Sequence, residues 1–394
     1  MRRLPLHLLE EILFKLDPKS LVKMPCTNKS INSHVLEDPN FKRKYYSRIG
    51  SSLLHVSKYA SNLLCFHPFG NSRSFNNTER LEILFNILAS CSGLLLLSIG
   101  GRLCVANPLT NKFRFMDYPN SGKTTCIGFA VDHIDLTTQK FKIVCIIEVL
   151  KPPNPDEKMY QFDINTGESW SLSKTTFTCH PSNLKKGKNS KPVYFNGDLH
   201  WLRKDGSIVA FNPKTEEARL IPIKFYLKPR KVLLCAGDNR LTLISATEEV
   251  VSVVAVENDG KCILVRRIKN EPVHLNTPLS YWNVQAYDGK CLVMRTMKNH
   301  PVERVVHSYN LRANKWEVVG TIPWWCDSNR NFFLFKPSLS SSVIGLLDQE
   351  EERNLLKLKA TSSRTYRQPD IESERRISSV MAIMGLVSRN LCFL

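Results

Sequence analysis

Residues 4–21 read LPLHLLEEILFKLDPKSL, and this stretch decides the first part of the fold. Pro5 suits the first turn of a helix, where its missing N–H costs nothing. The leucines and the isoleucine that follow recur at helical spacing and form one broad apolar stripe. Asp17 and Pro18 can end this helix and begin the next, as N-cap and first helical residue. The sequence therefore predicts a set of short helices that begins near residue 5.

The predicted helices carry more apolar surface than they can bury by themselves. Thr27 is expected to cap a third helix, and Asp38-Pro39 repeats the cap-plus-proline signal ahead of Phe41. About 45 residues in short helices cannot form a self-sufficient core. Because burial of one large aliphatic side chain contributes roughly 1.5–3 kcal/mol, the stripe is expected to pack either on the rest of this chain or on a partner protein.

The order and spacing of these residues resemble the F-box of plant proteins. The resemblance rests on Leu4-Pro5, Leu8, Glu11-Ile12-Leu13, Leu16, Pro18-Lys19-Ser20-Leu21, Cys26, Lys29, Asp38-Pro39 and Phe41, with departures at Pro25, Asn28 and Ile31. It implies that the segment binds a Skp-family linker protein and, through it, the cullin and RING subunits of a ubiquitin ligase. The residues that the resemblance assigns to the linker contact are Leu4, Pro5, Leu8, Leu9, Ile12, Leu13, Leu16, Pro18 and Leu21.

The composition is that of a folded protein without a membrane span. The chain has 394 residues, of which 42% are hydrophobic, and it has room for one small and one large domain. No apolar run is long enough to cross a bilayer, and the N-terminus lacks the pattern of a secretory signal. The 12 cysteines are scattered without metal-binding spacing. We therefore expect reduced thiols, no cofactor and no metal, and an intracellular location in the nucleus or the cytoplasm.

The net charge of +19 favours acidic partners. The densest basic stretch, Lys185–Lys191, is interpreted as an exposed and solvated loop. Two functions follow from the charge: recognition of a protein substrate with an acidic face, or, as the alternative, binding of nucleic acid by a basic β domain.

From about residue 90 the sequence is typical of an all-β protein. Short β-branched runs alternate with turn residues, as at Ile143–Ile147 and Val250–Val256. A unit of strand, Asn- or Asp-initiated turn and strand recurs about every fifty residues, which is typical of propeller blades of the kelch type. The turn positions assigned to this repeat are Asn107, Asp163, Asn212 and Asn310, with Val256–Gly260 as a further member. The prediction is a β-propeller of roughly six degenerate blades, with a pair of β-sandwiches as the alternative architecture.

The same region resembles the F-box-associated domain of plant proteins. The resemblance rests on Ser92–Leu95, Asn107–Thr110, Gly128–Asp132, Phe141–Val144 and Val193–Leu202, in which Gly93 and Gly197 precede expected inner strands. The predicted organisation is a helical F-box over 1–48, a connector with a first outer strand over 49–90, and the propeller over 91–347. Residues 348–394 are expected to form a variable segment that is partly mobile, with an apolar end over 380–394 that folds back as a closing strand or helix.

No catalytic motif appears in the sequence. It contains no glycine-rich phosphate loop, no nucleophile elbow and no His-Glu-x-x-His. The chain is therefore predicted to be a non-enzymatic substrate adaptor. An enzyme built on a propeller is a third class of function, which the absence of a metal site or an acid/base set disfavours. Aromatic residues are enriched at interface hot spots, and the candidates for substrate binding are Tyr281, Trp282, Trp324 and Trp325.

Overall fold

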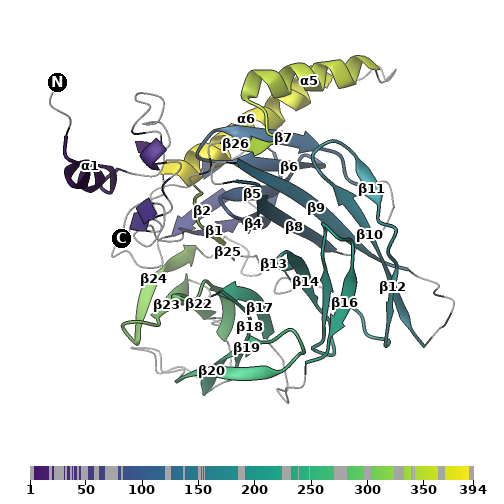
Figure 1. Cartoon of the computed structure of the whole chain (residues 1–394). Coiled ribbons are helices and arrows are strands. Elements are labelled where there is room, and N and C mark those ends of the chain that lie inside the picture. The colour runs from purple at the N-terminus through teal and green to yellow at the C-terminus, as the bar shows by residue number, and fades with distance from the viewer. Residues whose placement is uncertain are drawn as a thin grey trace.

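The computed structural model consists of an N-terminal helical segment, a ring of six β-sheets and two C-terminal helices (Figure 1). It describes residues 4–16, 20–21, 31, 33–35, 38, 40–41, 44–45, 52–56, 62–66, 79–80, 83–119, 126–135, 138–149, 152, 154, 156–184, 191–223, 232–237, 239–247, 249–269, 282–296, 303–323, 332–338, 340, 342–362 and 369–389. Within these residues, no helix combines the length and the apolar content that crossing a membrane requires.

The first three sheets hold the strands up to residue 179 and two strands from the C-terminal part of the chain. The first sheet contains, from the centre outward, β25 (Phe332–Phe335), β1 (Ser52–Val56), β2 (Asn62–Phe66) and β3 (Glu79–Arg80). The second contains β4 (Phe85–Cys91), β5 (Leu94–Ile99), β6 (Arg102–Asn107) and β7 (Lys112–Met116). The third contains β8 (Cys126–His133), β9 (Thr138–Glu148), β10 (Lys158–Asn165), β11 (Trp170–Leu172), β12 (Phe177–Cys179) and β26 (Ser342–Ile344).

The other three sheets follow one another in the chain. The fourth contains β13 (Val193–Phe195), β14 (Asp198–Leu202), β15 (Ile208–Phe211) and β16 (Ala218–Ile221). The fifth contains β17 (Val232–Gly237), β18 (Arg240–Ala246), β19 (Val250–Val256) and β20 (Cys262–Lys269). The sixth contains β21 (Trp282–Tyr287), β22 (Cys291–Thr296), β23 (Glu303–Asn310) and β24 (Lys315–Pro323).

The first-named strands of the six sheets form a closed inner ring. Each contacts the next in the cyclic order β25, β4, β8, β13, β17, β21 and back to β25. The sheets are therefore blades of a β-propeller, which confirms the predicted architecture and replaces the alternative of two sandwiches. Full closure also protects the inner strands from pairing with another chain.

The ring closes between strands that are distant in the sequence. β25 pairs antiparallel with β1, with Phe332 opposite His55 and Phe335 opposite Ser52. Residues 49–90, predicted to be a connector with a first outer strand, thus contribute three strands of the first blade and the start of β4. The sequence pattern missed this blade because its strands are short and its inner strand lies near residue 330.

The Asn-initiated turns connect the two outer strands of a blade. Asn107 Oδ1 accepts hydrogen bonds from the N–H groups two and three residues ahead, and Asn212 and Asn310 do the same. In the third blade the equivalent residue is Asn165, whose Oδ1 accepts from Gly167 N at 2.7 Å. The repeat position predicted at Asp163 was therefore wrong by two residues, because Asp163 lies inside β10.

The glycines at 93 and 197 belong to a different turn. Ser92 and Gly93 both have positive φ, of 45° and 81°, and they connect the inner strand β4 to β5. This is the backbone that a tight two-residue hairpin turn requires. A Cβ on Gly93 would lie 2.5 Å from Ser338 N, so the site excludes any side chain. The strand after the glycine is the second strand of the blade rather than the predicted inner one.

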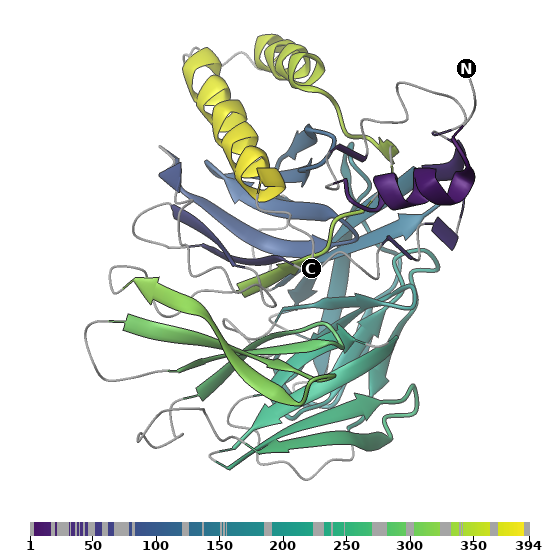
Figure 2. The same ribbon diagram turned by 90° about the vertical axis from the view of Figure 1, so that its left-hand side faces the viewer.

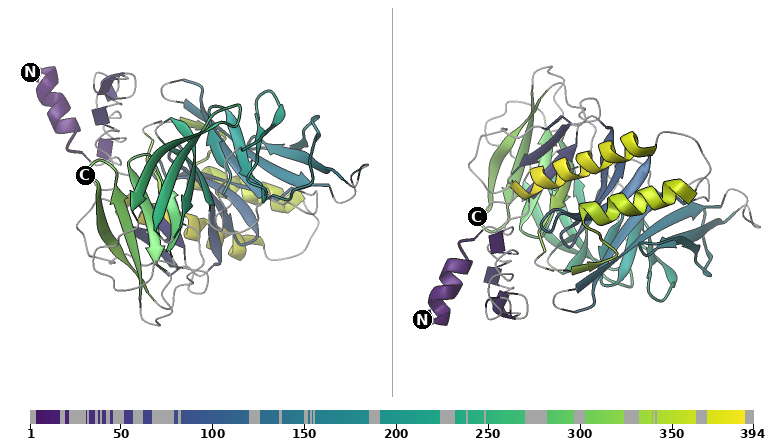
Figure 3. Two further views of the ribbon diagram at one scale, coloured as in Figure 1. Left: turned by 90° about the horizontal axis from the view of Figure 1, so that it is seen from below. Right: turned by 90° about the horizontal axis from the view of Figure 1, so that it is seen from above.

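Two helices cover one side of the propeller. α5 (Gln349–Ser362) and α6 (Pro369–Arg389) lie beside each other over the strands of the first two blades (Figures 2 and 3). Ile383 and Met384 of α6 are buried in a cluster with Phe333 and Phe335 of β25. Of the alternatives predicted for the apolar end, a strand or a helix, the structure has the helix, and it is helical also over Gln349–Ser362, where mobility was predicted. The acidic run that favoured mobility includes Glu352, which is fully buried and accepts a hydrogen bond from Phe115 N at 2.9 Å.

Candidate functional site

The N-terminal helical segment has a small core of its own. α1 (Leu6–Leu13) directs Leu13 into a cluster that also contains Phe14, Phe41 and Tyr45. The rings of Phe14 and Phe41 stack with centroids 5.0 Å apart, and Tyr45 Oη donates a hydrogen bond to Leu16 O at 2.8 Å. These contacts hold the short helices in a defined arrangement and fix which side of α1 faces outward.

The outward side of α1 is apolar. Leu8 and Ile12 lie one helical turn apart and are 40% and 49% exposed, and Leu4 and Leu6 are 49% and 58% exposed. Because residues four apart share one side of a helix, Leu8 and Ile12 form an exposed apolar patch there, with Leu4 ahead of the helix, and Leu6 lies on a different side of α1. Figure 3 shows α1 extending away from the β-sheets at one edge of the molecule, so the propeller does not cover this patch.

The residues that the sequence assigned to linker binding fall into two groups. Leu4, Pro5, Leu8 and Ile12 are exposed, and Leu9 and Leu16 are partly buried against the helical core. Leu13 and Leu21 are fully buried in that core, so their side chains shape the segment from inside. Leu6 is exposed but was not in the predicted set, although its place in the same apolar run was a signal for it. Pro18 lies outside the described residues.

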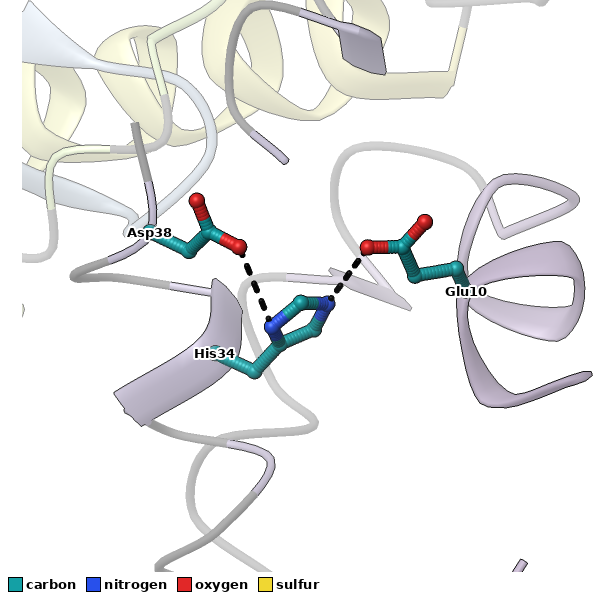
Figure 4. Close-up of side chains that lie close together, drawn as sticks. All are labelled: Glu10, His34 and Asp38. Atoms are coloured by element: carbon teal, nitrogen blue, oxygen red, sulfur yellow. Dashed lines mark ion pairs between the residues drawn. The ribbon is translucent and has the colours of Figure 1, made fainter. Parts of the chain in front are cut away.

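An ion-pair cluster connects α1 to the rest of the helical segment (Figure 4). His34 Nε2 lies 3.2 Å from Glu10 Oε1, and His34 Nδ1 lies 3.4 Å from Asp38 Oδ2. Lys44 Nζ lies 3.6 Å from the other oxygen of Glu10. The backbone N–H of Asn40, with that of Phe41, lowers the pKa of Asp38, which keeps this carboxylate charged.

This trio is the group of potential metal ligands found among the described residues. The imidazole of His34 stands between the two carboxylates, with one on each ring nitrogen. With one carboxylate at each ring nitrogen, the arrangement suits bridging contacts through the imidazole better than coordination of one ion by all three side chains. The cluster therefore serves to anchor the exposed helix.

Of the four aromatic candidates for substrate binding, one is among the residues that the structure describes. Trp282 begins β21, and Tyr281, Trp324 and Trp325 lie outside the described residues. In the chain, Tyr281 directly precedes β21, and Trp324 and Trp325 directly follow β24 and come ahead of β25. The inner strands β21 and β25 are neighbours in the ring. Their role in substrate binding stays a prediction.

A cavity of about 340 Å³ lies at the centre of the propeller. Residues from all six inner strands line it, among them Leu88 of β4, Phe129 of β8, Tyr194 of β13, Cys235 of β17 and Phe333 of β25. Most of the lining side chains are apolar or aromatic. The volume and the character of the walls are typical of sites for small ligands.

Two lysines reach this cavity. Lys191, just ahead of β13, donates a hydrogen bond to the carbonyl of Phe332, and its Nζ lies 3.9 Å from the centroid of the Phe333 ring. Burial lowers the pKa of Lys191 to about 7. Lys336 follows β25 and is exposed as a whole residue. Partial desolvation of its ammonium group, together with the nearby positive charge of Lys290, lowers the pKa of Lys336, and the negative charge of Asp288 opposes this shift. The sequence missed Lys191 because it reads as the last lysine of a solvated loop.

The two cysteines that line the cavity, Cys91 and Cys235, are poorly suited to act as nucleophiles. Burial raises the pKa of Cys91 to about 11 and also raises that of Cys235. Both groups therefore remain protonated near neutral pH, and a thiol is a poor nucleophile. The eight cysteines that the structure describes form no disulfide with one another.

Comparison with known proteins agrees with both parts of the structure. The F-box domain family matches residues 1–43, and the F-box associated beta propeller domain family matches residues 55–257. A protein of Arabidopsis thaliana named as an F-box/kelch-repeat protein is 68% identical over 350 residues, covering 89% of this chain and 80% of the relative.

Two further Arabidopsis thaliana proteins are similar along most of their length. One, named as an F-box protein, is 49% identical over 87% of this chain and 86% of its own. The other, named as an F-box/kelch-repeat protein, is 40% identical over 98% of this chain and 95% of its own. The chain therefore belongs to the plant F-box proteins that carry an F-box-associated β-propeller after the F-box.

Proposed function

We propose that this protein is the substrate-recognition subunit of a Skp–cullin–F-box ubiquitin ligase. The observation that carries the proposal is the exposed apolar patch of Leu8 and Ile12 on α1, with Leu4 ahead of the helix, on an F-box that has its own core. A linker protein of the Skp family would cover this patch. Removing these apolar side chains from water would favour such a contact.

In this role the chain makes and breaks no covalent bond. The F-box would connect the propeller to the linker, and the linker to the cullin and RING subunits. The propeller would hold a protein substrate so that a lysine of the substrate stays close to the charged ubiquitin carrier. Holding two reactants together in this way raises their effective concentration. The net charge of +19 favours a substrate with an acidic face.

The test is a binding measurement between the purified full-length chain and a Skp-family linker, with Ile12→Asp as the disrupting variant. Ile371→Asp is the matched control, because Ile371 is also an exposed isoleucine on a helix, at 54% against 49% for Ile12. We expect wild type and Ile371→Asp to bind and Ile12→Asp to lose at least tenfold in affinity. Equal binding by Ile12→Asp, or no binding by the wild type, would contradict the proposal.

A further inference from the structure

The central cavity combines apolar walls with a cation that has no counter-ion. Lys191 Nζ contacts the carbonyl of Phe332 and the face of the Phe333 ring. Among the described residues, no carboxylate lies within ion-pairing distance of this ammonium group, and the one influence on its pKa is burial. An ammonium has three N–H donors, of which the carbonyl takes one. A charged group kept in such a place costs stability unless something pairs with it.

The other polar groups at the cavity do not supply that partner. Tyr194 Oη donates a hydrogen bond to Asp132, which does not line the cavity, and Asp288 Oδ1 accepts from the backbone N–H groups of Lys290 and Cys291. Asp288 also raises the pKa of Lys336, so it acts on the other lysine. The counter-charge for Lys191 is therefore absent from the described part of the protein.

We propose that the propeller channel binds a small organic carboxylate, with its apolar body against the channel walls and its carboxylate on Lys191. The volume of about 340 Å³ corresponds to a molecule of small-ligand size. Apolar walls disfavour inorganic phosphate, which would lose its hydration on every side, and one ammonium matches one carboxylate. This function goes beyond the ligase role and does not depend on the linker contact.

The contacts of Lys191 hold its ammonium group in a position where it can pair with a ligand that fills the channel. Its carbonyl and ring contacts hold the ammonium in place before any ligand arrives, which reduces the entropy lost on binding. Six inner strands contribute to the walls, so a ligand would contact every blade at once. Occupancy would thus stabilise the ring as a whole, since a ligand that binds the folded state raises its stability.

Binding should depend on pH through Lys191. The pKa of this lysine in the free protein is lowered to about 7, and a bound carboxylate would favour the charged form and raise it. The affinity is therefore highest below pH 7 and falls by roughly tenfold per pH unit above it, until the pKa of the complex is reached. The cysteines and Tyr194 that face the cavity stay neutral in this range because their pKa values are raised.

The test is calorimetric titration of the full-length chain with octanoate and with its neutral counterpart octanamide, at pH 6.5. We expect octanoate to bind at least tenfold more tightly than octanamide. Lys191→Met should lower the octanoate affinity at least tenfold and leave octanamide unchanged. Lys315→Met, a change at a lysine that is 68% exposed in an outer strand, is the control and should match the wild type.

Three results would overturn the proposal: no saturable octanoate binding, equal binding of the acid and the amide, or octanoate binding that Lys191→Met leaves unchanged. Each can be read separately from the linker measurement. Loss of linker binding in Ile12→Asp with intact octanoate binding would show that the two sites are independent. Thermal unfolding of each variant, run in parallel, shows whether the propeller is folded.

Discussion

The F-box and the propeller are incomplete in opposite ways. The F-box buries a core of a few side chains around Leu13 and Phe41 and leaves an apolar stripe facing outward. The propeller closes on itself, and its central cavity holds the ammonium group of Lys191, for which the described residues supply no carboxylate. The first surface is flat and apolar, so it suits another protein. The second is concave and holds one charge, so it suits a small anion.

The largest expected effect comes from placing a charge in the core of the F-box, at the residue next to the exposed Ile12. Leu13→Asp should unfold the F-box and abolish linker binding, because a carboxylate buried without a partner costs at least about 4 kcal/mol. The neighbouring change Ile12→Asp should abolish linker binding and leave the F-box folded. Limited proteolysis between residues 1 and 50 measures the difference. If both variants resisted cleavage equally, the assignment of Leu13 to the core and of Ile12 to the exposed face would be wrong.

The next effect tests whether the C-terminal helices belong to the propeller. Met384 is fully buried in the cluster that joins α6 to the first two blades. Met384→Asp should therefore lower the melting temperature of the propeller by roughly 5 °C or more, which corresponds to about 4 kcal/mol or more of lost stability. Ile371→Asp on the exposed side of α6 should change it little. A Met384→Asp variant that melts like the wild type would separate the helices from the propeller fold.

A smaller effect tests how much the charge of Lys191 destabilises the folded protein. A lysine in the unfolded chain titrates near pH 10.4, and Lys191 in the folded protein has its pKa lowered to about 7. Between these values the unfolded chain binds more protons, so the penalty is full below pH 7 and fades as the pH rises toward 10. Lys191→Met should raise the melting temperature at pH 6.5 and lose this advantage near pH 10. A constant difference across this range would show that the charge of Lys191 carries no penalty.

The smallest effect concerns the turns that repeat around the ring. Asn310 Oδ1 accepts from Arg312 N at 2.9 Å and Ala313 N at 3.1 Å, in an exposed turn. Asn310→Ala should destabilise the propeller by about 1 kcal/mol, measured by urea denaturation. Asn310→Asp keeps an acceptor at the same place and should recover most of the loss. Equal losses in the two variants would mean that the turn depends on the amide and not on its oxygen.

Local signals were enough to predict much of this fold. The leucine spacing and Pro5 predicted the first helix, and Asn107, Asn212 and Asn310 predicted turns that the structure places in three blades. These features are readable because the partners in each hydrogen bond lie within three residues. The turn of the third blade was predicted two residues too early, because Asp163 and Asn165 have similar side chains. Which of the two begins the turn depends on the pairing of β10 with strands that are not adjacent in sequence to this position.

Features that depend on distant partners were not predictable. Glu352 reads as part of a solvated acidic run, yet it contacts the backbone of Phe115 in another element. Lys191 reads as the end of a basic loop, and its place in the channel depends on Phe332 and Phe333, which are far away in the chain. The first blade was missed for the same reason, since β1 has its inner neighbour in β25.

The pairing of β1 with β25 has a consequence for synthesis of the protein on the ribosome. His55 is translated long before Phe332, the residue opposite it in the finished sheet. At about 5–20 residues per second, the delay is roughly 15–55 seconds. During this time the F-box is already outside the ribosome, while β1 has one unpaired edge that can join a strand of another chain. We expect the nascent chain to need protection by a chaperone over this interval, and the need should end when residue 335 emerges.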